Sequence, residues 1–200
     1  MNKKEDTIRA YNQGALVLSK KFNEISPRVD DIQRAFSFIN KENPKVLELG
    51  CGNGRDAKEI LKFTNDYLGI DASVEMIKLS KEYLPDASFL VGDMETFNFP
   101  KNLDIIFAFA ALLHLDKPSV KDVLLKAHDS LSENGIFYFS VKLDLYHEKI
   151  KTDEFGQRTF YYYNIDDMRD LAKRTGYEVI YEDSQTIRGT NWLTVALRKI

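Results

Sequence analysis

Three glycines at alternating positions, directly after a short apolar segment, restrict the fold of this chain more than any other feature. Residues 46–49 (VLEL) read as a short buried strand, and Gly50, Gly52 and Gly54 follow it. Glycines at this spacing let the backbone turn sharply and let a ligand approach the main chain closely. A helix that begins after such a turn aims its amide groups at the same place. An ordinary tight turn is the alternative for a single Gly-x-Gly, but three glycines favour a ligand-binding turn.

Asp71 lies 21 positions after Gly50, at the end of a second predicted strand over residues 67–70. At this spacing a carboxylate lies beside a glycine-rich turn and can accept hydrogen bonds from both hydroxyls of a ribose. An aspartate at a strand end can also cap a helix or a loop. Together with the glycines, Asp71 indicates a nucleoside-containing ligand at the carboxyl ends of the first two strands.

Strands and helices alternate along most of the chain. Two N-terminal helices are expected, one over residues 5–24 and one that begins at the N-cap Ser26-Pro27. Further strands are predicted at 46–49, 67–70, 87–91, 104–110, 136–141, 177–181 and 192–198, further helices at 55–64, 73–83, 118–131 and 166–174, and an irregular loop at 143–163. Five βα units and a terminal antiparallel hairpin predict a single α/β, doubly wound sheet.

Composition excludes several other classes of protein. The formal net charge of -3 argues against nonspecific binding to nucleic acid or to anionic membranes, which requires a basic face. The one cysteine, Cys51, cannot form an intrachain disulfide, and three scattered histidines lack the spacing of metal ligands. No segment approaches the roughly 20 apolar residues that span a bilayer. We therefore expect a soluble, cytoplasmic monomer or homodimer that binds no metal, nucleic acid or membrane.

A dinucleotide-binding oxidoreductase is an alternative, because residues 52–57 (GNGRDA) satisfy the pattern Gly-x-Gly-x-x-Ala. The first glycine of that pattern should follow the strand almost at once, and Gly50 holds this place. Read from Gly50, the third position is Arg55, which is too bulky for the close contact between helix and strand. A chain of 200 residues also has little room for a separate substrate domain.

Residues 48–54 (ELGCGNG) are similar to the Glu/Asp-x-Gly-x-Gly-x-Gly signature of class I S-adenosylmethionine-dependent methyltransferases. The likeness continues in order through residues 68–77, 92–94, 103–115, 131–136 and 173–179, so that it covers roughly residues 44–199. The resemblance implies a Rossmann-like seven-stranded sheet of order 3-2-1-4-5-7-6, with strand 7 antiparallel, and additional N-terminal helices. It also implies one structural unit in which residues 1–43 form a helical cap and residues 44–200 form the methyltransferase domain.

The same resemblance implies S-adenosyl-L-methionine as the cofactor, S-adenosyl-L-homocysteine as the product, and a set of binding residues. The glycine-rich turn would contact the methionine part, Asp71 the ribose, the residues after strands two and three the adenine, and those after strand four the methyl group. Tyr11, from the N-terminal helix, would lie near the cofactor carboxylate. The expected cofactor residues are Tyr11, Glu48, Gly50, Cys51, Gly52, Asp71, Ala72, Met76, Asp93, Met94, Phe109 and Ala110.

The methyl acceptor is expected at the loop over residues 143–163, which combines charge with aromatic rings. Loops at the carboxyl ends of strands border the ligand crevice in open α/β sheets, and long irregular connections tend to be functional. Arg158, Tyr161 and Tyr163 are the predicted acceptor-binding residues; a short edge strand is the alternative for this segment. His114 and His147 are the candidate proton acceptors, although a structural role is the simpler interpretation of both.

These observations favour an enzyme that transfers a methyl group from S-adenosylmethionine to a small-molecule acceptor by in-line displacement. The negative charge favours a small molecule over nucleic acid, and the Asn/Asp-Pro-Pro-Tyr/Phe motif of many enzymes that methylate nucleic acids is absent after strand four. A noncatalytic module that binds the cofactor as a sensor is the second alternative, because no single required catalytic residue defines the family.

Overall fold

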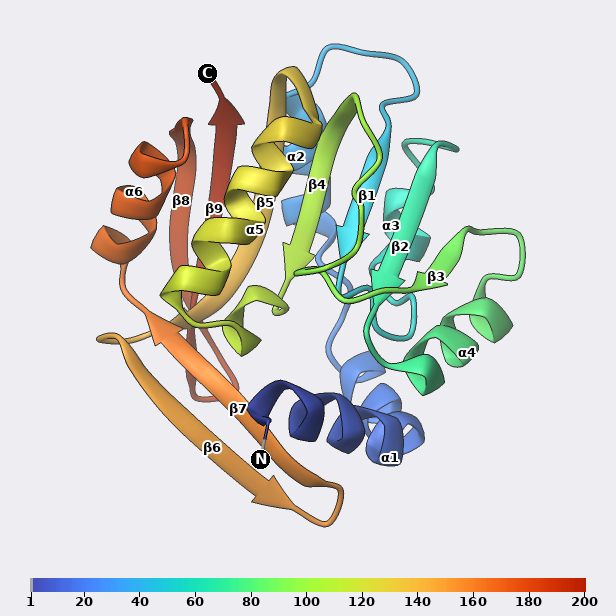
Figure 1. The fold of residues 1–200 in the computed structure, drawn as a ribbon. Helices are drawn as coiled ribbons and strands as arrows, with labels where there is room; N and C mark the ends of the chain where they lie inside the picture. Colours follow the sequence, from blue (N-terminus) through green and yellow to red (C-terminus); the bar gives the residue numbers. More distant parts are fainter. Residues whose placement is uncertain (1) are drawn as a thin grey trace.

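A computed structural model describes residues 2–200, which form one mixed sheet flanked by helices (Figure 1). Nine strands are present in this part of the chain: β1 (Val46–Leu49), β2 (Tyr67–Asp71), β3 (Phe89–Val91), β4 (Leu103–Phe109), β5 (Leu131–Leu143), β6 (His147–Asp153), β7 (Gly156–Tyr163), β8 (Tyr177–Ile187) and β9 (Thr190–Lys199). The helices are α1 (Lys3–Asn23), α2 (Val29–Ser37), α3 (Ala57–Ile60), α4 (Val74–Tyr83), α5 (Lys117–Ser130) and α6 (Ile165–Arg174), with a 3-10 turn η1 at Leu112–His114. Among these helices, none is both long and apolar enough to cross a bilayer.

The order of the main strands follows the expected doubly wound arrangement. β3, β2, β1, β4 and β5 pair side by side in parallel, and β9 then pairs antiparallel with β5 and with β8. With β8 and β9 as strands six and seven, this is the predicted order 3-2-1-4-5-7-6. β4 is buried along its whole length, as a central parallel strand requires.

The segment 143–163 was expected to be an irregular loop, and the structure corrects this: it contains the antiparallel hairpin β6–β7. β7 pairs with β5 only at Lys142 and Leu143, beyond the point where β4 ends opposite Ser140. β9 already occupies the other edge of β5 at Lys142, so β7 continues on the edge that β4 leaves. The predicted alternative, an edge strand, is therefore the correct one, and it lies beside α1 at the carboxyl end of the sheet (Figure 1).

Two further expectations about helices need correction. The helix predicted at 55–64 is regular only over Ala57–Ile60, and Asp56 before it accepts hydrogen bonds from Arg55 and from the Arg28 amide instead of capping it. The second N-terminal helix begins at Val29 rather than at Pro27, so Ser26 is not its N-cap. The predicted N-cap Ser73 is confirmed, since its hydroxyl accepts a hydrogen bond from the Met76 amide at 3.2 Å.

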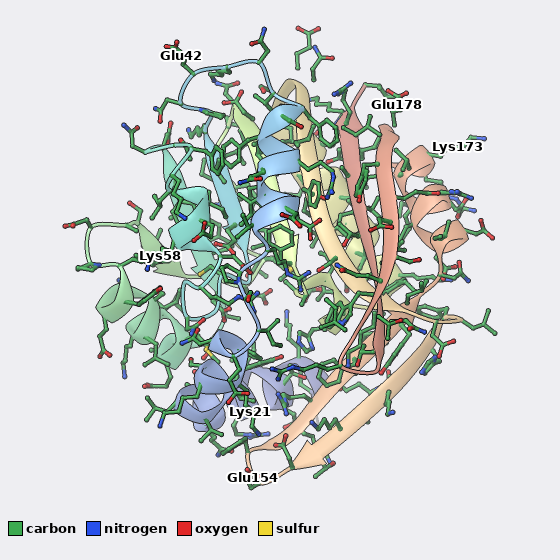
Figure 2. The ribbon with its side chains drawn as sticks, turned by 180° about the vertical axis from the view of Figure 1, so that it is seen from behind. Lys21, Glu42, Lys58, Glu154, Lys173 and Glu178 are labelled. Carbon is green, nitrogen blue, oxygen red and sulfur yellow. The ribbon has the colours of Figure 1, made fainter. Side chains whose placement is uncertain are left out.

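α1 covers the end of the sheet toward which β1, β2 and β4 point (Figure 1). Its apolar side packs Ala15 and Leu18 against Met76 of α4. Asn12 joins the same two helices, because its side-chain oxygen accepts hydrogen bonds from the Ser73 hydroxyl at 2.8 Å and from the Glu75 amide at 3.2 Å. Figure 2 shows Lys21 on α1 and Glu154 on the hairpin turn at the same end of the molecule.

Candidate active site

A cavity of about 360 Å³ lies at the carboxyl ends of β1, β2 and β4, beneath α1. Its size falls within the range of small-molecule sites. Ligands in open α/β sheets bind at this edge, where the order of the strands reverses. All the residues predicted to hold a cofactor line this cavity: Tyr11, Glu48, Gly50, Cys51, Gly52, Asp71, Ala72, Met76, Asp93, Met94, Phe109 and Ala110.

The glycine-rich turn owes its shape to positive φ angles of 70° at Gly50, 56° at Gly52 and 81° at Gly54. These angles lie in the left-handed region that side chains disfavour. A Cβ atom at Gly50 would lie 2.6 Å from that of Ala111, so this glycine is required by packing. A Cβ at Gly52 would meet no atom of the described chain within 4 Å. Gly52 therefore presents bare backbone to the cavity.

Asp71 lies beside this turn, as its spacing predicts. One carboxylate oxygen accepts a hydrogen bond from the Gly52 amide at 2.9 Å, and the other accepts one from the Ser73 amide at 2.8 Å. Burial raises the pKa of Asp71, and the two amides oppose that rise. Because a carboxylate has about four acceptor positions, Asp71 can accept two further hydrogen bonds from the cavity.

Two other predicted carboxylates differ in their surroundings. Glu48 is buried and accepts a hydrogen bond from the Tyr67 hydroxyl; burial, and then repulsion by Asp56, raises the pKa of Glu48 to about 8. Asp93 instead pairs with Lys4 of α1, whose Nζ lies 2.7 Å from a carboxylate oxygen. The contact of Lys4 is a tertiary feature that the sequence pattern did not predict.

Tyr11 and His114 meet in the cavity although they are far apart in the sequence. The Tyr11 hydroxyl lies 2.9 Å from Nε2 of His114, and Nδ1 of His114 lies 2.7 Å from the carbonyl oxygen of Thr159. A carbonyl can only accept, so Nδ1 carries the proton and Nε2 accepts from Tyr11. Burial lowers the pKa of His114 to about 4 and raises that of Tyr11 to about 12, so both groups are neutral near pH 7.

The predicted acceptor residues lie on two opposite faces of β7, because successive side chains of a strand alternate between its faces. Arg158 lines the cavity together with Phe160, whereas Tyr161 and Tyr163 lie on the opposite face of the strand. Tyr163 is buried with its hydroxyl on the Leu115 carbonyl, and Tyr161 stacks on Tyr146. Their expected place in the acceptor site is thus corrected, because positions 158, 161 and 163 cannot share one face of a regular strand.

Of the two candidate histidines, only His114 lines the cavity. His147 is exposed at the start of β6, where it stacks on Tyr162 at a ring-centroid distance of 4.3 Å. Cys51 is buried in the turn, and burial raises the pKa of its thiol. Residues 2–200 contain no cluster of side chains arranged to hold a metal ion.

Among the cavity residues that the sequence interpretation missed are Arg28, Lys142 and Trp192. Lys142 stands one residue beyond the predicted strand 136–141, so the rule that ligands bind at strand ends could have found it. Arg28 precedes α2 and carries no local signal. Its guanidinium lies 5.1 Å from the ring centre of Phe109 and 5.6 Å from that of Trp192.

The left-handed backbone of Ala110, with φ at 52°, is another feature of the cavity that the sequence did not predict. Its amide lies 3.1 Å from both the carbonyl and the hydroxyl oxygen of Ser140 in β5. Strained backbone of this kind persists where surrounding contacts hold it, and it is concentrated at functional sites.

Comparison with known proteins agrees with this geometry. Residues 46–135 match a family described as a methyltransferase domain. The chain is 27% identical over 173 residues to an uncharacterized methyltransferase of Bacillus cereus, covering 80% of this chain and 81% of that protein.

Two solved structures share the fold with a TM-score of 0.75. One is an S-adenosylmethionine-dependent methyltransferase from Clostridium acetobutylicum, 14% identical, with 94% of this chain and 98% of that chain covered. The other is 1,6-didemethyltoxoflavin-N1-methyltransferase from Burkholderia thailandensis, 15% identical, with 100% and 91% covered. Its fold, its glycine-rich turn and these relatives identify the chain as a methyltransferase that is similar to the class I S-adenosylmethionine-dependent enzymes.

Proposed function

We propose that this methyltransferase acts on a small molecule, and that cofactor and acceptor share the cavity beneath α1. The observation that carries the proposal is the enclosure of the glycine-rich turn, Asp71 and the Tyr11–His114 pair in one space of about 360 Å³. A macromolecular acceptor would have to present its nucleophile through a cap formed by α1. Residues 1–43 would act as that cap and residues 44–200 as the methyltransferase domain.

The cavity residues fit S-adenosylmethionine. Asp71 has spare acceptor positions for the ribose hydroxyls, and the bare backbone at Gly52 leaves room for the adjoining methionine part. Ala72, Met76, Asp93 and Met94 border the adenine side, while Phe109 and Ala110 border the methyl group. Lys4 already occupies one oxygen of Asp93, so adenine would share that carboxylate with α1.

Arg28 fits the one carboxylate of this cofactor. Its Nε atom is buried and has no hydrogen-bond partner among residues 2–200. Burial lowers the pKa of Arg28, because the guanidinium is removed from water. A bound carboxylate would supply the missing partner and offset this cost. Glu48 would lie toward the amino group of the same methionine part, where a cation would favour its ionised form.

The cofactor supplies an electrophilic methyl group on a sulfonium, so the protein need not generate the reactive species. The residues of this chain would hold the acceptor in line with that methyl group and exclude water. Tyr11 and His114 form the path for a proton: the acceptor would donate to the Tyr11 oxygen while the phenol proton passes to Nε2 of His114. His147 is exposed and does not line the cavity, so it has no place in this path.

The small-molecule assignment agrees with the formal net charge of -3 and with the Burkholderia neighbour, whose structure contains 1,6-didemethyltoxoflavin and S-adenosylhomocysteine. Membership of the methyltransferases sets aside the oxidoreductase alternative.

The test uses S-adenosylmethionine with a radiolabelled methyl group and a cell extract split into a small-molecule filtrate, a protein fraction and a nucleic-acid fraction. We expect label to enter a component of the filtrate, and no label to be transferred by a Gly52→Val variant. Label in protein or nucleic acid alone would contradict the proposal. Calorimetric titration with S-adenosylhomocysteine and with NADH checks the cofactor separately.

A further inference from the structure

Lys142 faces the cavity without a counterion. No carboxylate within residues 2–200 lies within salt-bridge distance of its Nζ. The Nζ atom instead lies 3.8 Å from the ring centre of Phe160 and 5.2 Å from that of Tyr162. Burial, together with repulsion by Lys149, Lys151 and Arg158, lowers the pKa of Lys142 to about 8.

Arg158 is the second cation at this end of the cavity. Its side chain is only 6% exposed, and one of its terminal nitrogens pairs with Asp153. Its Nε atom is buried and has no hydrogen-bond partner in the part of the chain that the structure describes. An unpaired buried donor costs free energy, so a ligand that accepts from this nitrogen would be stabilised.

The two cations lie close to the residues of the proposed proton path. Lys142 contacts the ring of Phe160, whose centre is 4.9 Å from that of His114. Arg158 lies 5.4 Å from the ring centre of Tyr11, and the Tyr11 and His114 rings are 5.4 Å apart. A group held between the cations would therefore lie beside the residues that receive the acceptor's proton.

The other charges of the cavity do not neutralise this end. Asp71 is held by two backbone amides, Asp93 pairs with Lys4, and Asp56 pairs with Arg55. Arg158 already has Asp153, and Arg28 is assigned to the cofactor carboxylate, so among the described residues Lys142 supplies the positive charge left for the acceptor. One unbalanced positive charge and one free donor match a singly charged anion better than a dianionic phosphate group.

From this arrangement we infer that the methyl acceptor carries a carboxylate, which binds between Lys142 and the free Nε of Arg158, with its body against Phe160 and Trp192. The inference rests on the proposed function, because it assigns the acceptor of the same site. It adds Lys142 and Arg158 as residues that determine specificity, by pairing with an anion and leaving a neutral analogue without a partner.

The experiment measures binding of small acids to the protein saturated with S-adenosylhomocysteine, by calorimetry at pH 7. The probes are benzoate, salicylate and succinate, each paired with its neutral amide, and inorganic phosphate. We expect at least one acid to bind about 10-fold or more tightly than its amide, because a charge-assisted hydrogen bond is lost in the amide. Equal binding within every pair, or no binding of any acid, would overturn the inference, as would binding of phosphate alone.

Variants then locate the anion. Lys142→Met should remove the preference for the acid and leave affinity for S-adenosylhomocysteine unchanged. Arg158→Lys, which keeps the charge beside Asp153, should weaken binding of the acid because the Nε donor is lost. The matched control is Lys173→Met on α6, which removes the same charge. The Lys173 side chain points away from the molecule (Figure 2).

The outcomes separate the two proposals. If S-adenosylhomocysteine itself does not bind, the proposed function fails. If it binds normally but Lys142→Met leaves the acid preference intact, only the carboxylate inference fails. If Lys142→Met weakens binding of S-adenosylhomocysteine as strongly as binding of the acid, Lys142 binds the cofactor carboxylate and the inference also fails.

Discussion

The hydroxyl of Tyr11 donates a hydrogen bond to Nε2 of His114 over 2.9 Å, and this contact joins the N-terminal helix to the turn after β4. The contact depends on the tautomer of the histidine, which the Thr159 carbonyl sets through Nδ1. It brings a phenol and a neutral imidazole to the place where the acceptor of a methyl group would lie.

The first prediction concerns this tautomer. Nitrogen-15 NMR of the imidazoles should show His114 neutral, with its proton on Nδ1, from pH 8 down to about 5, because burial lowers its pKa to about 4. Tyr11→Phe should shift the Nε2 resonance and leave Nδ1 protonated, whereas Tyr83→Phe, at a half-exposed tyrosine of α4, should change neither. A proton on Nε2, or titration near pH 6.5, would show that the dyad is wrongly assigned.

Replacing Asp71 should weaken binding of the cofactor. Asp71→Ala removes the carboxylate beside the Gly52 amide, and the loss of hydrogen bonds to a charged acceptor worth ~1.5–3 kcal/mol should weaken S-adenosylhomocysteine by roughly 10- to 150-fold. Asp86→Ala, at an exposed position, is the control and should bind normally. Isothermal titration calorimetry measures both variants. Equal affinities would remove Asp71 from the ribose site.

Two glycines with positive φ allow the effect of backbone strain on stability to be measured apart from the effect of blocking the site on binding. Gly52, with φ at 56°, and Gly189, with φ at 75°, both have open space at the position of a Cβ, within the described part of the chain. Alanine at either should destabilise the protein by about 1–2 kcal/mol through left-handed strain. Only Gly52→Ala should also abolish binding of S-adenosylhomocysteine, because Gly189 lies in the β8–β9 turn. Thermal unfolding and calorimetry on both variants give the comparison, and similar binding by the two would contradict it.

Glu48 should make the protein less stable as pH rises. Its pKa of about 8 lies above the ordinary value of 4.5, so the folded protein holds this proton more tightly than the unfolded chain. The resulting stabilisation is fully present below about pH 4.5 and is lost as pH rises through about 8.

Melting temperatures across this pH range provide the measurement for Glu48. Glu48→Gln, which stays neutral, should flatten the decline between pH 5 and 8.5. Glu178→Gln, at an exposed position on β8, should not (Figure 2). An unchanged pH dependence in Glu48→Gln would mean that Glu48 is ionised in the folded protein at neutral pH.

The geometry around the glycine-rich turn could be predicted because it depends on local sequence. One βα unit, whose geometry varies little, connects the first strand and its glycine-rich turn to the carboxylate after the next strand. Parallel neighbours then bring strand ends together, so Gly52 and Asp71 form a hydrogen bond that their spacing anticipates. The same regularity made the order of the main strands predictable.

The other end of the cavity could be predicted only in part. Tyr11, His114 and Arg158 were expected as site residues, but Lys142 was not, and neither was the contact between Tyr11 and His114. These four residues come from α1, the turn after β4, β5 and β7. The segment 143–163 lacks a helical period and is rich in charge, so it was interpreted as a loop. Once it pairs as a hairpin, the strand period of two directs Arg158 and Phe160 into the cavity and Tyr161 and Tyr163 out of it.

The sequence by itself thus determined the doubly wound sheet and the glycine-rich turn beside Asp71, because apolar periodicity, glycine conformation and the spacing of Asp71 act within a few tens of residues. The resemblance of its motifs indicated the family. Only the tertiary structure decided what surrounds the proposed acceptor site. Desolvation and the pairing of charges depend on which distant side chains meet. Lys142 lacks a counterion within residues 2–200, and His114 is neutral, because α1 and the β6–β7 hairpin close over the end of the sheet.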